Sequence, residues 1–213
     1  MSNRVRVKIC GLTNREDAEA AIELGADALG FNLYTGSKRF IELEAEADWM
    51  RALPPFVTRV AVMVNPTIAE AERVFAQPFI DAVQFHGNES PEFCAHFAGR
   101  GLTFLKAVSL RDEASFASAR NFPTQNILLD AYVPGEFGGT GKLIALDLAE
   151  KLAAAHPELN LVLSGGLNPE NVAAAVRRVR PYAVDVASGV ESAPRRKDRA
   201  LMRAFIAAAT ASA

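Results

Sequence analysis

Residues 5–14, with the sequence VRVKICGLTN, set the pattern on which the rest of the chain is built. An apolar run of strand character ends in Cys10, and the chain then turns at Gly11. The residues TNRE at 13–16 have the form of a capping box, in which a Thr and a Glu side chain satisfy the first amide groups of a helix. The stretch therefore predicts a strand, a tight turn and a helix, with a thiol at the end of the strand.

The same unit recurs along the whole chain. Eight short apolar runs alternate with helical patterns, and the runs start 21 to 34 residues apart. They are continuously apolar, as expected of parallel strands that are covered on both faces. The predicted strands are Val5–Cys10, Asp27–Asn32, Val57–Val64, Asp81–Phe85, Leu102–Val108, Asn126–Asp130, Asn160–Ser164 and Ala183–Ala187.

Helix signals lie between these strands. Thr67 and Glu70 form a second capping box, while Ser90-Pro91 and Asn168-Pro169 each place a capping residue before a proline. The helical stretches rich in alanine and leucine are Ala18–Leu24, Ile68–Phe75, Leu146–Ala155 and Val172–Val179. Eight strand–helix units in 213 residues predict an α/β fold, a (β/α)8 TIM barrel, as a single domain over residues 1–213. An open doubly wound sheet is the alternative.

The composition excludes several classes of protein. Half of the residues are hydrophobic and 23% are charged, which is typical of a globular chain. The net charge of −2 gives no broad attraction for nucleic acid or for an anionic membrane. No apolar stretch approaches the ~20 residues that span a bilayer, and the N-terminus lacks a signal-peptide hydrophobic segment. We therefore expect a cytoplasmic protein in which Cys10 and Cys94 are free thiols.

Two glycine-rich loops predict a phosphate site. Active sites of (β/α)8 barrels lie at the carboxyl ends of the strands, and phosphate commonly binds in the loops after strands seven and eight. Glycine also lets backbone N–H groups approach an anion closely. We therefore predict that Gly165, Gly166, Ser188 and Gly189 bind phosphate. The structural alternative is that these glycines only permit tight turns.

Cys10 and Asp130 are the candidates for proton transfer, because they end the first and sixth predicted strands. These strands face each other across the barrel mouth, so an acid and a base there could move a proton within a bound sugar without a cofactor. Each residue also has a structural interpretation. Cys10 could be a buried apolar residue, and Asp130 could be a carboxylate that braces a loop.

Other chemistries find less support in the sequence. The three histidines, His86, His96 and His156, are not placed to meet around one metal ion, so we expect no metal. Lys8 and Lys106 lie within strands and could form a Schiff base, although a buried lysine more often pairs with a carboxylate. The basic cluster at 195–199 is interpreted as a solvated turn. The long glycine-containing stretches 34–40 and 132–142 are candidate substrate loops.

Six motifs in order resemble the phosphoribosylanthranilate isomerase family of tryptophan biosynthesis. The likeness runs from residue 7 to about residue 198. The motifs are KICGLT at 8–13, GADALGF at 25–31, VQFHG at 83–87, LLDA at 128–131 with GGTGK at 138–142, SGGLNPENV at 164–172 and VDVASGVE at 184–191. The resemblance implies a cofactor-free Amadori rearrangement of a phosphosugar by a monomer or homodimer.

The family's residue roles carry over to matching positions. By this resemblance Asp130 is the general acid that opens the ribose ring, and Cys10, as a thiolate, is the base that removes the C2′ proton. Arg39 lies near the anthranilate carboxylate. Gln84 and His86 line the site, and Asp185 contacts substrate hydroxyls. The helix after Cys10 is expected to supply part of the lowering of the thiol pKa from its usual value of about 8.5.

The sequence departs from the family pattern at three places. Lys38 replaces a proline before Arg39, which puts the placement of that arginine in question. The residues LIALD at 143–147 follow Lys142 where a Phe-Asp-Trp triplet is common, and Arg195 stands where glycine is frequent. Two alternative functions stay open: a related isomerase of histidine biosynthesis, whose substrate has phosphates at both ends, and a sugar-phosphate binding protein without catalytic activity.

Overall fold

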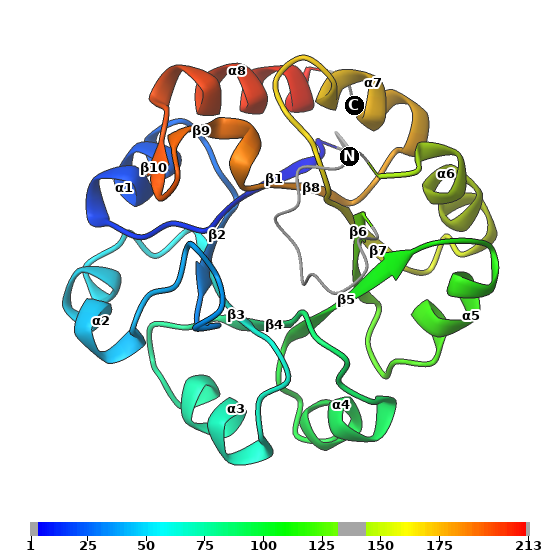
Figure 1. Ribbon diagram of the computed structural model, residues 1–213, viewed down its shortest axis with the longest axis horizontal. Helices are drawn as coiled ribbons and strands as arrows, with labels where there is room; N and C mark the ends of the chain where they lie inside the picture. Colours follow the sequence, from blue (N-terminus) through cyan, green and yellow to red (C-terminus); the bar gives the residue numbers. More distant parts are fainter. Residues whose placement is uncertain (1–3, 132–143, 212–213) are drawn as a thin grey trace.

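Eight parallel strands close into a barrel, and helices surround it (Figure 1). The computed structural model describes residues 4–131 and 144–211, so the predicted loop at 132–142 lies outside the described residues. The barrel strands are β1 (Arg6–Cys10), β2 (Ala28–Asn32), β3 (Thr58–Met63), β4 (Ala82–Phe85), β5 (Phe104–Leu110), β6 (Asn126–Ala131), β7 (Asn160–Leu163) and β8 (Ala183–Val186). The predicted (β/α)8 barrel is confirmed, and every predicted strand bound is correct within two residues.

The pairing of β1 with both β2 and β8 closes the barrel, which excludes the open sheet. All barrel pairs are parallel, because each strand is followed by a helix that returns the chain to the starting end. The helices are α1 (Arg15–Glu23), α2 (Leu43–Arg51), α3 (Ile68–Phe75), α4 (Pro91–Ala98), α5 (Ala114–Arg120), α6 (Leu146–Ala155), α7 (Val172–Val179) and α8 (Arg199–Thr210).

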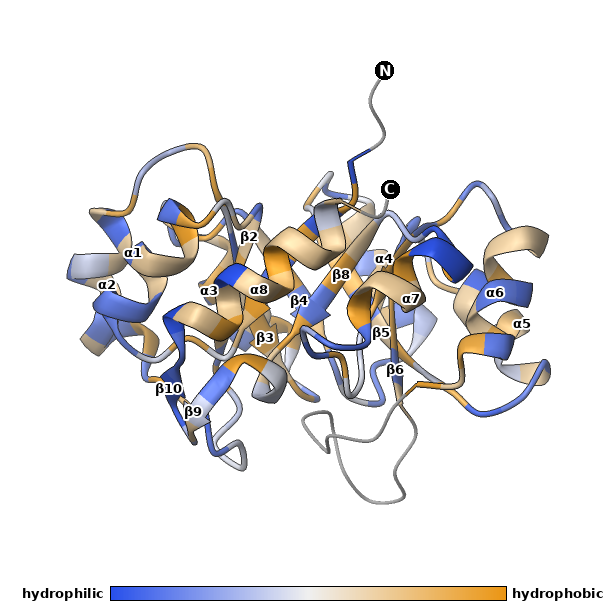
Figure 2. Ribbon diagram, turned by 90° about the horizontal axis from the view of Figure 1, so that it is seen from above, coloured by the Kyte–Doolittle hydropathy of each residue, from blue (hydrophilic) through white to orange (hydrophobic). Residues whose placement is uncertain are grey.

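The chain after β8 adds a short 3₁₀ helix, η1 (Ser188–Val190), and an antiparallel hairpin of β9 (Glu191–Ala193) and β10 (Arg196–Lys197) before α8. Because this segment follows the carboxyl end of β8 directly, it lies at the end of the barrel where the site was predicted. In Figure 2 the hairpin lies at the lower edge of the molecule.

Two helix caps differ from the prediction. The N-cap of α1 is Asn14, whose side chain accepts a hydrogen bond from Asp17 N at 2.8 Å, and Thr13 instead donates its hydroxyl to Arg195 O at 2.9 Å. The predicted capping box at 13–16 is therefore wrong, because a distant segment takes up the Thr13 hydroxyl. Asn168 caps a turn over Glu170 and Asn171 and not the helix itself, whereas α7 begins at Val172, where the predicted helical stretch begins.

The main hydrophobic core lies between the barrel and the helices, and a smaller cluster of Ala107, Leu128, Val162 and Ala183 lies inside the barrel. Figure 2 shows hydrophobic colouring on strands and along much of the helices, with hydrophilic stretches on parts of the outer helices and on loops. Within the described ranges, no helix is long and apolar enough to cross a membrane.

Candidate active site

One cavity at the carboxyl ends of the strands collects the residues that the sequence singles out. It is lined by all ten predicted site residues, which are Cys10, Arg39, Gln84, His86, Asp130, Gly165, Gly166, Asp185, Ser188 and Gly189. Asn32, Ser37 and Ser164 also line it. The strands bring these side chains together because the carboxyl ends of parallel strands meet at one rim of the barrel.

Cys10 ends β1 and is only 9% exposed. Its burial raises the pKa of the thiol above the ordinary value, and Asp185 adds to this effect, while the charges of Lys8 and Lys197 act in the opposite direction. The sequence predicts a lowered pKa at the start of a helix, and the structure gives the opposite direction. Helix α1 begins only at Arg15, so loss of hydration is the larger effect on the sulfur.

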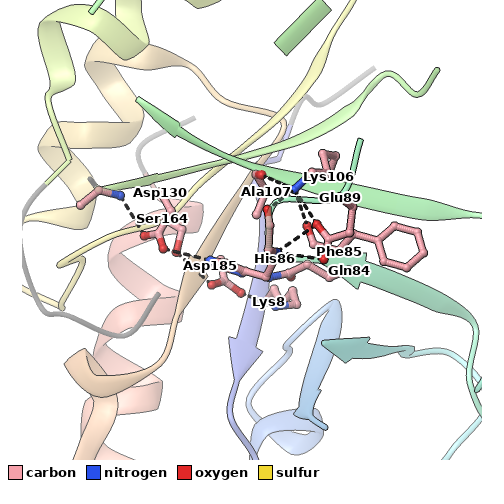
Figure 3. A network of polar contacts seen from close by, with 12 residues as sticks. Lys8, Gln84, Phe85, His86, Glu89, Lys106, Ala107, Asp130, Ser164 and Asp185 are labelled. Carbon is pink, nitrogen blue, oxygen red and sulfur yellow. Dashed lines mark hydrogen bonds and ion pairs between the residues drawn. The ribbon is translucent and has the colours of Figure 1, made fainter. Parts of the chain in front are cut away.

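Asp185 is held inside the barrel by two partners (Figure 3). Lys8 Nζ lies 2.6 Å from Asp185 Oδ1, and Ser164 Oγ donates to Asp185 Oδ2 at 3.1 Å. The Lys8 and Asp185 side chains are both buried, so the pair is a buried salt bridge completed by a hydroxyl. Both carboxylate oxygens are therefore fixed at the floor of the cavity.

Asp130 ends the row of apolar residues in β6 and is bound from two sides. The backbone N–H of Ala131 donates to Asp130 Oδ1 at 2.9 Å, and His86 Nε2 lies 3.1 Å from Oδ2. His86 Nδ1 is in turn 2.6 Å from Gln84 Nε2 (Figure 3). The predicted residues Gln84, His86 and Asp130 thus form one hydrogen-bonded row along the rim.

Arg39 is fixed by a carboxylate that the sequence analysis does not assign. Its Nε and Nη2 atoms donate to Glu191 Oε1 and Oε2, both at 2.7 Å, in a bidentate pair. Lys197 Nζ contacts the same carboxylate at 3.0 Å. Lys197 is 7% exposed, so the interpretation of 195–199 as a solvated turn is wrong at this position.

The charges of Arg39, Glu191 and Lys197 affect each other's ionisation. Burial alone would raise the pKa of Glu191, but Arg39 and Lys197 hold it below its usual range. The hydrogen bond from Arg39 to Glu191 raises the arginine pKa, whereas burial lowers that of Lys197. The carboxylate therefore stays ionised and anchors the guanidinium at the edge of the cavity.

The glycines of the predicted phosphate loops have conformations that other residues rarely adopt. Gly165 and Gly166 have φ angles of +88° and +64°. A Cβ at Gly189 would lie 2.0 Å from Leu167 O, so the loops after β7 and β8 touch there. Among the described residues, the amide groups of Gly165 and Gly166 donate to no protein acceptor. Both glycines line the cavity, so these turns lie where the phosphate site is predicted.

The two strand lysines are both paired. Lys106 Nζ lies 2.9 Å from Glu89 Oε2 and donates to the Ala107 and Gly87 carbonyls, as Lys8 pairs with Asp185 (Figure 3). Neither lysine lines the cavity. This arrangement matches the expectation that a buried lysine pairs with a carboxylate, and it disfavours a Schiff base.

Comparison with known proteins shows to which family this chain belongs. The sequence profile described as N-(5′-phosphoribosyl)anthranilate (PRA) isomerase matches residues 7–208. A relative of that name from Geobacter metallireducens is 46% identical over 207 residues, which cover 97% of this chain and 100% of the relative. The chain belongs to the PRA isomerase family.

Solved structures of PRA isomerases agree with this assignment. The enzyme from Thermotoga maritima is 43% identical, with a TM-score of 0.86, over 97% of this chain and 99% of the other. A PRA isomerase solved in complex with reduced 1-(o-carboxyphenylamino)-1-deoxyribulose 5-phosphate is 41% identical, with a TM-score of 0.83 and the same coverage.

Two departures from the PRA isomerase pattern are accommodated locally. Lys38 is exposed, and Ser37 Oγ accepts a hydrogen bond from Arg39 N at 3.1 Å, which fixes the backbone without a proline. Arg195 adopts φ +71°, which favours glycine, and its guanidinium donates to Phe40 O at 2.8 Å. The departure at 143–147 begins outside the described residues.

Two residues of this PRA isomerase family member, Glu191 and Lys197, hold Arg39 or its partner but are not predicted from the sequence. Glu191 ends the quoted motif VDVASGVE, which is the one signal that could have found it. Lys197 stands in a run of basic residues that gives no sign of burial. Its role depends on the hairpin of β9 and β10, where Lys197 pairs with Glu191.

Proposed function

We propose that this chain catalyses the Amadori rearrangement of N-(5-phosphoribosyl)anthranilate to 1-(2-carboxyphenylamino)-1-deoxyribulose 5-phosphate, the isomerase step of tryptophan biosynthesis. Its membership of the PRA isomerase family supports this function. The single observation that carries it is the lining of one cavity by Cys10, Asp130, Arg39 and both glycine loops. The reaction moves only protons within the substrate and uses no cofactor or metal.

Asp130 is the general acid in the first step. It transfers a proton to the furanose ring oxygen, the bond from that oxygen to C1′ breaks, and the ring opens to a Schiff base with the anthranilate nitrogen. His86 Nε2, at 3.1 Å, and the Ala131 N–H orient the carboxyl group, and Gln84 holds the imidazole ring. This fixed geometry directs the proton toward the substrate.

Cys10 is the base in the second step. Its thiolate removes the C2′ proton, the C2′–C1′ bond gains double-bond character, and the electron pair moves to nitrogen to give an enolamine. The enolamine then tautomerises to the ketone. Cys10 and Asp130 lie on strands separated by β7 and β8 on the shorter path around the barrel, which supports action on opposite sides of one sugar.

The other lining residues place the substrate. The phosphate rests on the N–H groups of the loops at Gly165, Gly166, Ser188 and Gly189. Arg39, with its remaining guanidinium donors, binds the anthranilate carboxylate. Gln84 Oε1 is buried and has no partner among the described residues, so it is available to accept a hydrogen bond from a substrate hydroxyl.

The test of this mechanism is the loss of turnover in two variants. We expect Cys10→Ala and Asp130→Asn each to lower kcat at least ~100-fold, because each removes a general acid or base. Product formation from PRA is followed by chromatography. Folding is checked by circular dichroism, and retention of the site by binding of the reduced product analogue.

Cys94→Ala and Asp147→Asn are the matched controls, since both residues lie away from the cavity. They should retain kcat within about threefold. Near-normal turnover in either site variant would exclude the assigned acid or base. Turnover of the histidine-pathway ribonucleotide in place of PRA would favour the related isomerase, and product-analogue binding without any turnover would favour a binding protein.

A further inference from the structure

Lys8 is a buried lysine that the proposed mechanism leaves without a role. It is 3% exposed and lies on β1 two residues before Cys10, so both side chains lie on the same face of the strand. Asp185, its register partner on β8, holds the ammonium at 2.6 Å. The Lys8 charge is thus fixed directly beneath the cavity floor.

Gly30 on β2 provides the space in which Lys8 and Cys10 meet. A Cβ at Gly30 would lie 2.7 Å from Cys10 Sγ and 3.0 Å from Lys8 Nζ, so both atoms reach the same point beside this glycine. The Lys8 ammonium therefore lies close to the Cys10 sulfur, and its positive charge favours the thiolate. Any side chain at position 30 would push into this contact.

Several other charges face the sulfur from neighbouring elements. Asp185 on β8 disfavours a thiolate, while Lys197 on β10 and Arg39 after β2 favour it. Lys197 and Arg39 both contact Glu191, which offsets much of their charge at the sulfur. Lys8 is therefore the cation with the most direct influence on Cys10.

We propose that Lys8 is a positioning residue that acts through Cys10: its fixed positive charge beside the sulfur favours the thiolate over the thiol, and Asp185 keeps that charge in place. This inference rests on the proposed function in one respect only, which is the role of the Cys10 thiolate as the base. Lys8 and Cys10 lie close together in the protein without substrate, so the effect of Lys8 on the thiol can be tested without substrate.

A fixed cation is needed because the site is poorly hydrated. Burial raises the pKa of Cys10, and an unpaired thiolate in such a place would be costly. Burial would also lower the pKa of Lys8, but Asp185 and Cys10 more than reverse this and raise it above its usual value. Lys8 thus stays charged through the range in which Cys10 ionises.

The experiment measures the rate at which iodoacetamide alkylates Cys10 between pH 6 and 9, read from the Cys10 peptide by mass spectrometry. Only the thiolate reacts, so the rate follows its fraction. In Lys8→Met we expect the rise in rate to move about one pH unit higher, which is about tenfold slower alkylation at pH 7. The pH profile of kcat/KM should move in the same direction.

Lys106→Met is the matched control. It removes another buried, carboxylate-paired strand lysine, which contacts Glu89 and not Cys10. This control should leave the alkylation profile of Cys10 in place. Equal profiles for wild type and Lys8→Met would overturn the proposal, as would an equal displacement in both lysine variants.

A second variant separates the lysine charge from the unpaired aspartate that Lys8→Met leaves behind. Lys8→Met/Asp185→Asn removes both charges and is used for alkylation alone. We expect it still to react several-fold more slowly than wild type, and a wild-type rate would overturn the proposal. Absence of PRA turnover in the wild-type protein would contradict the proposed function. The alkylation rates would still decide whether Lys8 favours the Cys10 thiolate.

Discussion

At the scale of single residues, Glu191 illustrates how one carboxylate organises a binding arginine. It takes the Nε and Nη2 donors of Arg39 and also contacts Lys197, and its side chain is only 7% exposed. A guanidinium held in this way loses little rotational freedom when a substrate carboxylate binds to its remaining donors. Glu191 is therefore expected to act on substrate affinity more than on the chemical step.

Replacing Glu191 tests this expectation. Glu191→Gln should raise KM for PRA about tenfold, equivalent to ~1.4 kcal/mol, with kcat changed by less than about threefold, because Arg39 loses its bidentate anchor. Steady-state kinetics give both constants. Glu113→Gln, which breaks an exposed pair with Lys151, serves as the control and should leave both constants in place. An unchanged KM in Glu191→Gln would show that Arg39 does not need this anchor.

At the scale of elements, helix α3 has the most complete N-terminal cap. Thr67 Oγ1 accepts from Glu70 N at 3.2 Å, and Glu70 Oε2 accepts from Thr67 N at 2.7 Å, as the sequence predicts. The same pattern fails at Thr13, where the hydroxyl bonds to Arg195 O. A local motif is thus reliable only where no distant segment offers its side chains another partner.

The cap of α3 should be measurable in stability. We expect Thr67→Ala to lower the free energy of unfolding by about 1 kcal/mol, because amide groups of the first turn lose their acceptor. Urea unfolding followed by circular dichroism measures the change, with turnover unaffected because Thr67 does not line the cavity. Ser118→Ala, at an exposed position inside α5, should change stability by no more than ~0.5 kcal/mol. An equal loss in both variants would contradict the role of the cap.

At the scale of the whole molecule, a cluster of aromatic rings joins the barrel to its outer helices. Phe85 on β4 contacts Phe93 and Phe97 on α4 and Phe104 on β5, with ring centroids 5.2 to 5.6 Å apart. Phe75 on α3 stacks on Phe97 at 5.3 Å. Phe85 forms the centre of this cluster.

Truncation of a central ring should weaken the whole fold. Phe97 is fully buried, so Phe97→Ala should lower the free energy of unfolding by ~3–5 kcal/mol through lost burial and a cavity. Denaturant unfolding is the measurement. Leu201→Ala removes an apolar side chain from an exposed position on α8 and should cost ~2 kcal/mol less than Phe97→Ala. Similar losses would mean that the aromatic cluster contributes no more than surface packing.

Much of this protein follows from its sequence by itself. The eight strands, the glycine loops and the positions of Cys10 and Asp130 at strand ends are set by local features: continuous apolar runs, turns at glycine and the spacing of strand–helix units. A parallel barrel then converts strand ends into one rim, so residues far apart in sequence could be assigned to a common cavity.

Only the tertiary structure decided how these residues are charged and held. Lys8 meets Asp185 across 177 positions of sequence, and Arg39 meets Glu191 across 152. Neither pairing has a local signal, because both depend on the closure of β1 on β8 and on the path of the chain after β8. The direction of the Cys10 pKa was also decided there, since burial and neighbouring charges, and not the adjacent helix, determine the energy of a thiolate in this cavity.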